Sequence, residues 1–310
     1  MRWVTYVSPS DGADRVGLVG GDEIQGLPRT VGLLDLLGDD GESLARAADE
    51  VQSDPFEVIA YAGAGLRAPI PVPPSIRDFL AFEEHVRTIR EAQGVGVDPS
   101  WYDLPVFYFS NPAAVYGPQD SIAISPGSRQ FDYELEVAAV VGRGGSDLAP
   151  EEAETHIAGY SVMCDWSARD LQFQEMVLRL GPAKGKDSAT SMGPMLVTPD
   201  ELEPWRQGGR LRLSMRASVN GREYSNGNLG DMYWSFGQLM AYASRGTRLM
   251  PGDVIGSGTV GTGCILERSL TLGAERYPWL RAGDAVTLEV DGLGAIEARI
   301  KAGVEPLPLK

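Results

Sequence analysis

Acidic and apolar side chains alternate along residues 131–142, whose sequence is FDYELEVAAVVG. The β-branched second half predicts a strand, in which Asp132, Glu134 and Glu136 share one face. Two carboxylates about 4 Å apart repel by about 4 kcal/mol at an effective dielectric constant of 20. Hard oxygen ligands at this spacing suit Mg²⁺, Mn²⁺ or Ca²⁺. The segment therefore indicates either a metal site or an exposed acidic strand end.

The chain has two histidines, and one of them follows an aspartate at helical spacing. Residues 75–94 predict a helix that begins at Ser75, and residues seven apart on a helix lie on one face. Asp78 and His85 are then neighbours on that face. Asp78 also fits a capping box with Ser75, and a single buried histidine is more often structural.

Two further stretches carry charged residues at places suited to chemistry. Asp165 follows a predicted strand at a strand–helix junction, where it either caps the helix or binds a ligand. Lys184 and Lys186 lie in the Gly/Ser/Thr-rich loop 180–202, whose amides and ammonium groups suit an anion. The loop does not match a Walker A motif.

The elements that must position these residues form two parts. Residues 1–70 predict a small unit with short strands at 3–7 and 14–19 and short helices at 31–37 and 44–52. The proline-rich stretch 69–74 is the expected linker to a larger unit, residues 71–310. The last third is rich in strands, with predicted elements at 211–219, a turn at 220–221, a helix at 231–245, and strands at 254–260 and 285–290. The pattern predicts an α+β, β-rich fold.

The amino-acid composition limits the classes of partner that the protein can bind. The 310 residues contain 27 basic and 43 acidic side chains, a net charge of −16. Such a chain lacks the basic face that nucleic acids and anionic membranes require. No apolar run reaches the roughly 18 residues of a membrane span, and residues 1–15 have no signal-peptide core. We expect a cytoplasmic protein whose two cysteines, Cys164 and Cys264, are reduced.

An ordered series of motifs gives a more specific indication. Together they resemble the fumarylacetoacetate hydrolase family over residues 75–300. The motifs are DFLAFEEH at 78–85, YELE at 133–136, DWSARDLQ at 165–172, GKDSATSMGP at 185–194, MYWSFGQL at 232–239 and LMPGDVIGSGTVG at 249–261.

The resemblance implies a mixed β-sheet roll preceded by a small N-terminal α/β domain, usually in a homodimer. It implies a divalent ion, Mg²⁺ or else Mn²⁺ or Ca²⁺. The implied metal ligands are Asp78, Glu134, Glu136 and Asp165, the implied catalytic residues are His85, Lys186 and Glu267, and the implied substrate contacts are Tyr108, Arg169, Gln172 and Thr259.

The implied activity is metal-dependent hydrolysis of a C–C bond in an acylpyruvate-like or 1,3-diketo acid. His85 would activate water, and the metal and Lys186 would stabilise an enolate. The alternative is a decarboxylase acting on a 2-oxo acid or a 2-hydroxydienedioate isomerase, which share that enolate.

The sequence departs from the family pattern at three positions. Thr88 replaces the glutamate that orients the histidine in one branch, so Glu267 is the expected partner of His85, as in another branch. Leu80 and Met176 replace tyrosines that contact fumarylacetoacetate, and the lost hydroxyl groups argue against that compound as the substrate.

Overall fold

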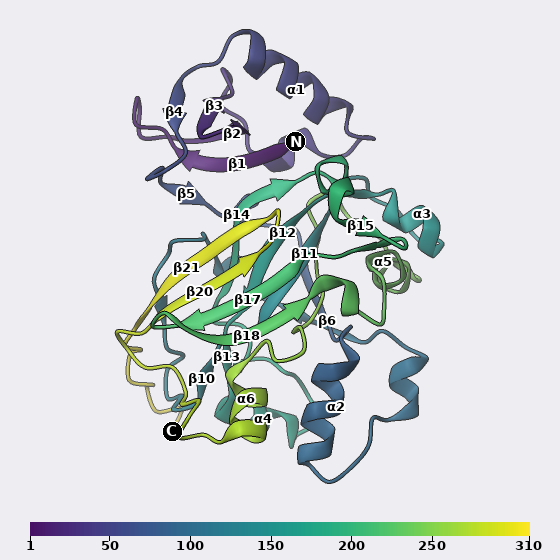
Figure 1. Ribbon diagram of the computed structural model, residues 1–310, viewed down its shortest axis with the longest axis vertical. Coiled ribbons are helices and arrows are strands. Elements are labelled where there is room, and N and C mark those ends of the chain that lie inside the picture. The colour runs from purple at the N-terminus through teal and green to yellow at the C-terminus, as the bar shows by residue number, and fades with distance from the viewer.

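The computed structural model describes residues 1–310 and contains two main β-sheets that pack face to face (Figure 1). The larger sheet has 12 strands and the smaller has five, in the order β18-β17-β20-β21-β9. Strands of the larger sheet are β1 (Arg2–Val7), β2 (Asp14–Gly20), β3 (Glu23–Gly26), β4 (Val58–Ala60), β5 (Leu66–Arg67), β6 (Ile76–Phe79), β7 (Phe107–Ser110), β8 (Val115–Tyr116), β11 (Leu135–Val141), β12 (Ile157–Asp165), β14 (Thr190–Val197) and β19 (Val254–Gly256). Strands of the smaller sheet are β9 (Ile122–Ala123), β17 (Ser214–Val219), β18 (Arg222–Asn228), β20 (Ala285–Val290) and β21 (Gly294–Lys301).

Short strand pairs and helices complete the fold. The pairs are β10 (Phe131–Asp132) with β13 (Ser167–Ala168), and β15 (Arg206–Gln207) with β16 (Arg210–Leu211). The α-helices are α1 (Glu42–Ser53), α2 (Glu83–Ala92), α3 (Pro150–Glu154), α4 (Arg169–Met176), α5 (Phe236–Ser244) and α6 (Ile265–Leu272). The 3₁₀ helices are η1 (Leu33–Leu36), η2 (Pro99–Tyr102), η3 (Pro112–Ala114), η4 (Pro199–Trp205) and η5 (Leu229–Asp231). Figure 1 shows α2, α4 and α6 at the end of the molecule opposite α1. The predicted α+β, β-rich class is confirmed.

Strand β11 lies at the centre of the molecule and is buried on both faces. Val137, Ala139 and Val141 belong to the core between the two sheets, and Ala138 and Val140 to a second apolar cluster on the other side. This is the alternation that a strand imposes on its side chains. This strand begins directly after Glu134 and contains Glu136, so its two buried faces support the backbone of both acidic residues.

The first 70 residues extend the larger sheet. Strand β1 pairs with β14 through Arg2 with Val197 and Trp3 with Leu196, and Trp3 and Leu44 lie in the second apolar cluster. The strands predicted at 3–7 and 14–19 and the helix at 44–52 are present, but residues 31–37 form only the 3₁₀ turn η1. The boundary near residue 70 stays a prediction.

The helix predicted over residues 75–94 is wrong in its first part. Residues 76–79 form strand β6, which pairs in parallel with β19 and antiparallel with β7. All four residues are buried, and tertiary pairing overrides the local helical pattern. Helix α2 begins at Glu83, so Asp78 and His85 do not share a helix face.

The strand predicted over residues 131–142 is interrupted. Strand β10 ends at Asp132, whose carboxylate accepts the N–H of Tyr133 at 2.8 Å, and β11 begins at Leu135. Three other predicted elements are shorter than expected, because β17 covers only 214–219, β19 only 254–256 and α5 only 236–244. The hairpin at 220–221 and the strand at 285–290 are confirmed.

A buried ion pair fixes β6 to the turn before β19. Arg77 Nη1 lies 3.0 Å from Asp253 Oδ2, and Ser75 Oγ donates to Asp253 Oδ1 at 2.7 Å. Both charged side chains are at least nine-tenths buried. Removing one partner of such a pair leaves a buried charge without compensation.

We therefore expect Arg77→Met to lower the free energy of unfolding by about 3–5 kcal/mol, measured by urea denaturation. Arg67→Met is the control, because its pair with Asp14 is about half exposed and is expected to contribute less than about 1 kcal/mol. Equal losses in the two variants would contradict the importance of the buried pair.

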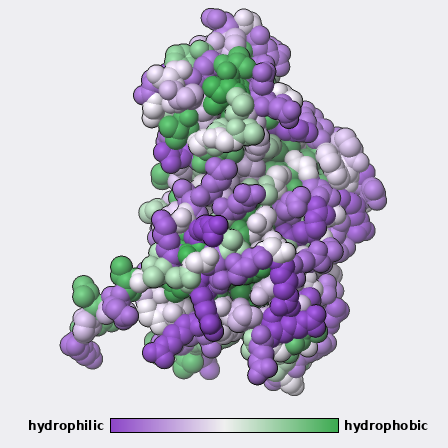
Figure 2. Space-filling model, turned by 60° about the vertical axis from the view of Figure 1, so that its left-hand side comes forward, coloured by the Kyte–Doolittle hydropathy of each residue, from purple (hydrophilic) through white to green (hydrophobic).

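The surface is mostly hydrophilic on the face shown in Figure 2, where hydrophobic groups are scattered among the hydrophilic ones. Both cysteines are buried and unpaired, as expected. None of the helices combines the length and the apolar character needed to cross a membrane.

Candidate active site

Three acidic side chains from distant parts of the chain converge at the ends of the central strands. Asp78 lies on β6, Glu134 lies in the break between β10 and β11, and Asp165 ends β12. One oxygen atom of each lies within 4.8 Å of the others, and all three residues are buried. The break between β10 and β11 therefore leaves Glu134 close to Asp78 and Asp165.

Glu136, the fourth predicted ligand, lies beside this group. Its Oε2 accepts the N–H of Gly258 at 3.0 Å. Gly256 opposes Asp78 in the β19–β6 register, and a Cβ there would lie 2.7 Å from Asp78 Oδ1 and 3.1 Å from Glu136 Oε2. The glycine leaves room for both carboxylates.

The cluster has unsatisfied oxygens and too little positive charge. Asp78 Oδ1, Glu136 Oε1 and Asp165 Oδ1 are buried without a hydrogen-bond partner. Buried polar atoms normally have one. Together with Asp132, the cluster contains five buried carboxyl groups and two buried cations, Arg169 and Lys186, so three negative charges are in excess when every carboxyl group is ionised. Oxygen donors with this charge fit a divalent hard cation.

The pKa values of the four predicted ligands reflect the same excess of carboxyl groups over cations. Burial is the main cause that raises the pKa of Asp78, Glu136 and Asp165, and the charges of Asp78 and Glu134 raise the pKa of Glu136 further. Burial acts in the same direction on Glu134, but Arg169 and Lys186 outweigh it and hold the pKa of Glu134 well below its ordinary value. A further cation beside Asp78, Glu136 and Asp165 would thus favour their ionised forms.

Lys186 reaches into the cluster, whereas Lys184 points to solvent. Lys186 Nζ lies 2.5 Å from both Glu134 Oε2 and Asp165 Oδ2. Burial opposes the charged form, but Asp165 and Glu134 outweigh it and raise the pKa of Lys186, so the group stays an ammonium. Lys184 is 73% exposed and pairs with Asp187.

Sequence reasoning missed the residue that holds the lysine loop. Glu175, on α4, accepts the N–H groups of Ala183, Lys184 and Gly185 at 3.0, 2.7 and 3.1 Å. These bonds outweigh burial and lower the pKa of Glu175. No sequence motif marks such a glutamate, because its partners are backbone groups.

We expect Glu175→Ala to reduce kcat by about tenfold, because the loop that carries Lys186 loses three charge-assisted hydrogen bonds. Glu175→Gln keeps one acceptor oxygen and should recover part of the loss. Steady-state kinetics on both variants provide the check, with the exposed Glu152→Ala as control. An unchanged kcat in the alanine variant would exclude this positioning role.

Asp132 was not assigned a role from the sequence and is a positioning residue. Its carboxylate accepts the N–H groups of Ile265 and Leu266 at 2.7 and 3.1 Å, and Arg169 Nε donates to it at 2.8 Å. Arg169 Nη2 in turn lies 2.7 Å from Glu134 Oε1. Asp132 thus connects the start of α6 to the acidic cluster. The sequence feature that could have indicated this role is that Asp132 and Glu134 are two residues apart, on one face of the predicted strand.

His85, on α2, is hydrogen-bonded through Nδ1 to Glu267 Oε1. Glu267 is buried on the first turn of α6. Its other oxygen accepts the N–H of Thr262. A carboxylate acceptor on Nδ1 leaves Nε2 as the nitrogen that can take a proton.

A cleft of about 440 Å³ joins these groups. His85, Glu134 and Lys186 line it together with all four predicted substrate contacts, Tyr108, Arg169, Gln172 and Thr259. Gln172 Oε1 accepts from Arg169 Nη1 at 3.2 Å. The hydroxyl of Tyr108 lies 2.8 Å from Asp78 Oδ2 and 2.5 Å from Asp165 Oδ2. Tyr108 therefore contacts the acidic cluster itself.

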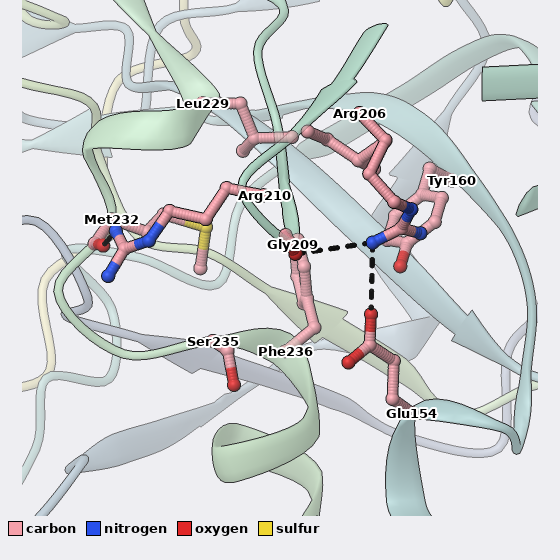
Figure 3. A pocket seen from close by; sticks show the side chains of 10 residues that line it. Glu154, Tyr160, Arg206, Gly209, Arg210, Leu229, Met232, Ser235 and Phe236 are labelled. Carbon is pink, nitrogen blue, oxygen red and sulfur yellow. Dashed lines mark hydrogen bonds and ion pairs between the residues drawn. The ribbon is translucent and has the colours of Figure 1, made fainter. Parts of the chain in front are cut away.

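A second cavity, drawn in Figure 3, contains none of the predicted site residues. It measures about 70 Å³. Its charged groups already have partners, since Arg206 Nη1 lies 3.5 Å from Glu154 Oε1 and donates to the carbonyl of Gly209 at 3.3 Å. The cleft lined by His85, Glu134 and Lys186 is therefore the candidate site.

Comparison with known proteins assigns the chain. Residues 75–301 match the model for the fumarylacetoacetate (FAA) hydrolase C-terminal domain. The chain belongs to the fumarylacetoacetate hydrolase family. Members of this family are enzymes, and the named relatives include hydrolases, isomerases and a tautomerase.

Three relatives illustrate the range of activities named in this family. The mitochondrial oxaloacetate tautomerase fahd2 of Xenopus laevis is 31% identical over 259 residues, which cover 83% of this chain and 74% of that protein. A fumarylacetoacetate hydrolase of Exiguobacterium antarcticum superposes with a TM-score of 0.74 at 25% identity over 97% of this chain and 99% of that one. A maleylpyruvate hydrolase of Sphingobium sp. SYK-6, solved with manganese(II) and pyruvate, shares the fold at 22% identity, with a TM-score of 0.73 over 98% of this chain and 100% of that one.

Proposed function

We propose that the protein is a divalent-metal-dependent hydrolase that cleaves a C–C bond in an acylpyruvate-like or 1,3-diketo acid. The observation that carries this proposal is that His85 lines the same cleft as Glu134 and Lys186 and is hydrogen-bonded to the buried Glu267. A base next to a cation-binding cluster is what activation of water at a carbonyl requires.

Four residues would hold the ion: Asp78, Glu134, Glu136 and Asp165. Their unpartnered oxygens, excess negative charge and all-oxygen donor set support Mg²⁺, Mn²⁺ or Ca²⁺. The manganese-bound relative supports the same class of ion. When bound, the ion would supply Lewis-acid polarisation of the substrate carbonyl.

The remaining roles follow from the positions of the side chains. Nε2 of His85 takes the proton from water, while the Glu267 carboxylate keeps Nδ1 protonated and stabilises the imidazolium that forms. Bond cleavage leaves a carbanion that is delocalised as an enolate, and the Lys186 ammonium stabilises this charge. Tyr108, Arg169, Gln172 and Thr259 orient the 2-oxo acid.

A second candidate is enolate chemistry without water, as in decarboxylation, tautomerisation or isomerisation of a 2-oxo acid. The 31% identical relative named as an oxaloacetate tautomerase favours it. Decarboxylation needs a positive charge near the developing enolate, which Lys186 would supply, and tautomerisation or isomerisation also needs a proton donor or acceptor.

The test compares acetylpyruvate and oxaloacetate in the presence of Mg²⁺, by loss of enol absorbance and release of CO₂. Lys186→Met should reduce turnover of both compounds by about 10²–10³-fold, whereas His85→Ala should spare any decarboxylation of oxaloacetate. Lys184→Met is the matched control. Equal losses of both activities in His85→Ala, or damage from Lys184→Met alone, would contradict the division of roles.

The proposed assembly is a homodimer. Light scattering coupled to size exclusion would then give twice the chain mass of 33.3 kDa.

A further inference from the structure

A second group of metal-binding residue types lies beside the acidic cluster. Helix α2 packs against α6 and brings His85 together with Cys264 and Glu267 at the start of α6. Cys264 is the N-cap residue of α6 and Glu267 follows three residues later, so both side chains lie on the same side of the helix start. One ligand atom of each of the three residues lies within 4.8 Å of the others, and all three residues are buried.

The thiol of Cys264 is buried without a partner. It forms no disulfide, and the structure contains no hydrogen bond to its sulfur. Its neighbours are charged rather than apolar, since Asp132, Glu267 and Arg169 all act on its ionisation. Burial raises the pKa of this thiol, so it keeps its proton until a cation displaces it. A free buried thiol among charged groups is available to a metal ion.

The ligand atoms of this group differ in kind from those of the acidic cluster. The acidic cluster offers carboxylate oxygens, which suit Mg²⁺, Mn²⁺ or Ca²⁺, whereas this group offers one sulfur, one nitrogen and one oxygen. Thiolate and imidazole ligands select Zn²⁺ instead. Bonds of about 2.0–2.3 Å in a tetrahedral Zn²⁺ site place the ligand atoms about 3.3–3.6 Å apart. Side-chain movements of about 1.5 Å or less would bring the three atoms to these separations.

The cleft gives an ion access to this group. His85 lines the cleft, so a Zn²⁺ ion bound to it can keep a water molecule as its fourth ligand. Cys264 pairs with Glu134 in an isolated backbone bridge, which places the group next to the acidic cluster without sharing a side chain with it. Both groups can therefore hold an ion.

We propose that His85, Cys264 and Glu267 form a second metal site, which binds Zn²⁺ and thereby inhibits the protein. The thiol proton is released to solvent when the sulfur binds the ion. With the ion on Nδ1, the nitrogen of His85 that faces Glu267, the ring proton moves to Nε2, which then cannot take a proton from water. The inhibition rests on the proposed role of His85 as the base, whereas the binding of Zn²⁺ does not.

Cobalt(II) reports the site without turnover, because a thiolate bound to Co²⁺ gives an intense charge-transfer band in the near ultraviolet. The protein is saturated with Mg²⁺ and then titrated with Co²⁺. The wild type should develop the band, and Zn²⁺ should remove it. Cys264→Ser and Cys264→Ala should lack the band. Cys164→Ser changes the other buried cysteine and is the matched control, which should keep it.

The inhibition is measured on the Mg²⁺-loaded protein with acetylpyruvate. Zn²⁺ should inhibit the wild type, and Cys264→Ser should need more than about 100-fold more Zn²⁺ while its rate without Zn²⁺ stays unchanged. Absence of the cobalt band in the wild type, or its persistence in Cys264→Ser, would overturn the site. A band without inhibition by Zn²⁺ would overturn the inhibitory role. Absence of hydrolysis in the wild type would contradict the proposed function, and the cobalt band would still decide the site.

Discussion

Replacing His85 by alanine is expected to lower the rate of C–C hydrolysis by about 10²–10⁴-fold, the contribution of a positioned general base. The fold and the affinity for the metal should be retained, because His85 is not among the acidic side chains that converge at the cluster. Steady-state kinetics on a substrate that the wild type hydrolyses provide the measurement, with circular dichroism to verify folding.

Two companion variants sharpen this test. Glu267→Gln keeps the shape of the partner but removes the charge that stabilises the imidazolium, and should lose a large part of the same activity. His156→Gln changes the other histidine, which binds Arg143 outside the cleft, and should remain active. A loss of less than about tenfold in His85→Ala would rule out its role as the base.

Glu136→Ala is expected to weaken binding of the divalent ion by more than about 100-fold. Removing a hydrogen-bond partner of a metal ligand already costs 10–100-fold in affinity, so removing a ligand should cost more. Glu136 is fully buried, and one of its oxygens has no partner in the protein. Titration calorimetry with Mn²⁺ and elemental analysis after dialysis measure the effect.

Glu275→Ala removes an exposed carboxylate and serves as the control for the change in net charge. It should bind one ion per chain with the affinity of the wild type. If Glu136→Ala also retained one ion per chain with unchanged affinity, the assignment of the four carboxylates as ligands would be wrong.

Much of the site could be predicted because its residues lie next to strands that the local sequence pattern identifies. Glu134 and Glu136 are two residues apart at the start of an apolar strand, and Asp165 is the last residue of another strand. The structure brings Asp78, Glu134 and Asp165 together. The Asn220–Gly221 hairpin was predictable for the same reason, since its turn chemistry is local.

The rest depended on contacts between distant segments. Residues 76–79 have a helical pattern, yet they form a strand because β19 and β7 flank them on both sides. Glu175 could not be recognised from the sequence because its partners are backbone groups. Local pattern cannot report such tertiary partners.

The central claim is that this cleft uses water to cleave a C–C bond, and isotope transfer tests it most directly. Acetylpyruvate is incubated with the metal-loaded protein in heavy-oxygen water, and the acetate formed is analysed by mass spectrometry. Hydrolysis predicts that the acetate contains one heavy oxygen atom from water and that pyruvate appears in equal amount. Acetylpyruvate that remains intact, or that only changes its keto–enol form while the metal is bound, would contradict the claim.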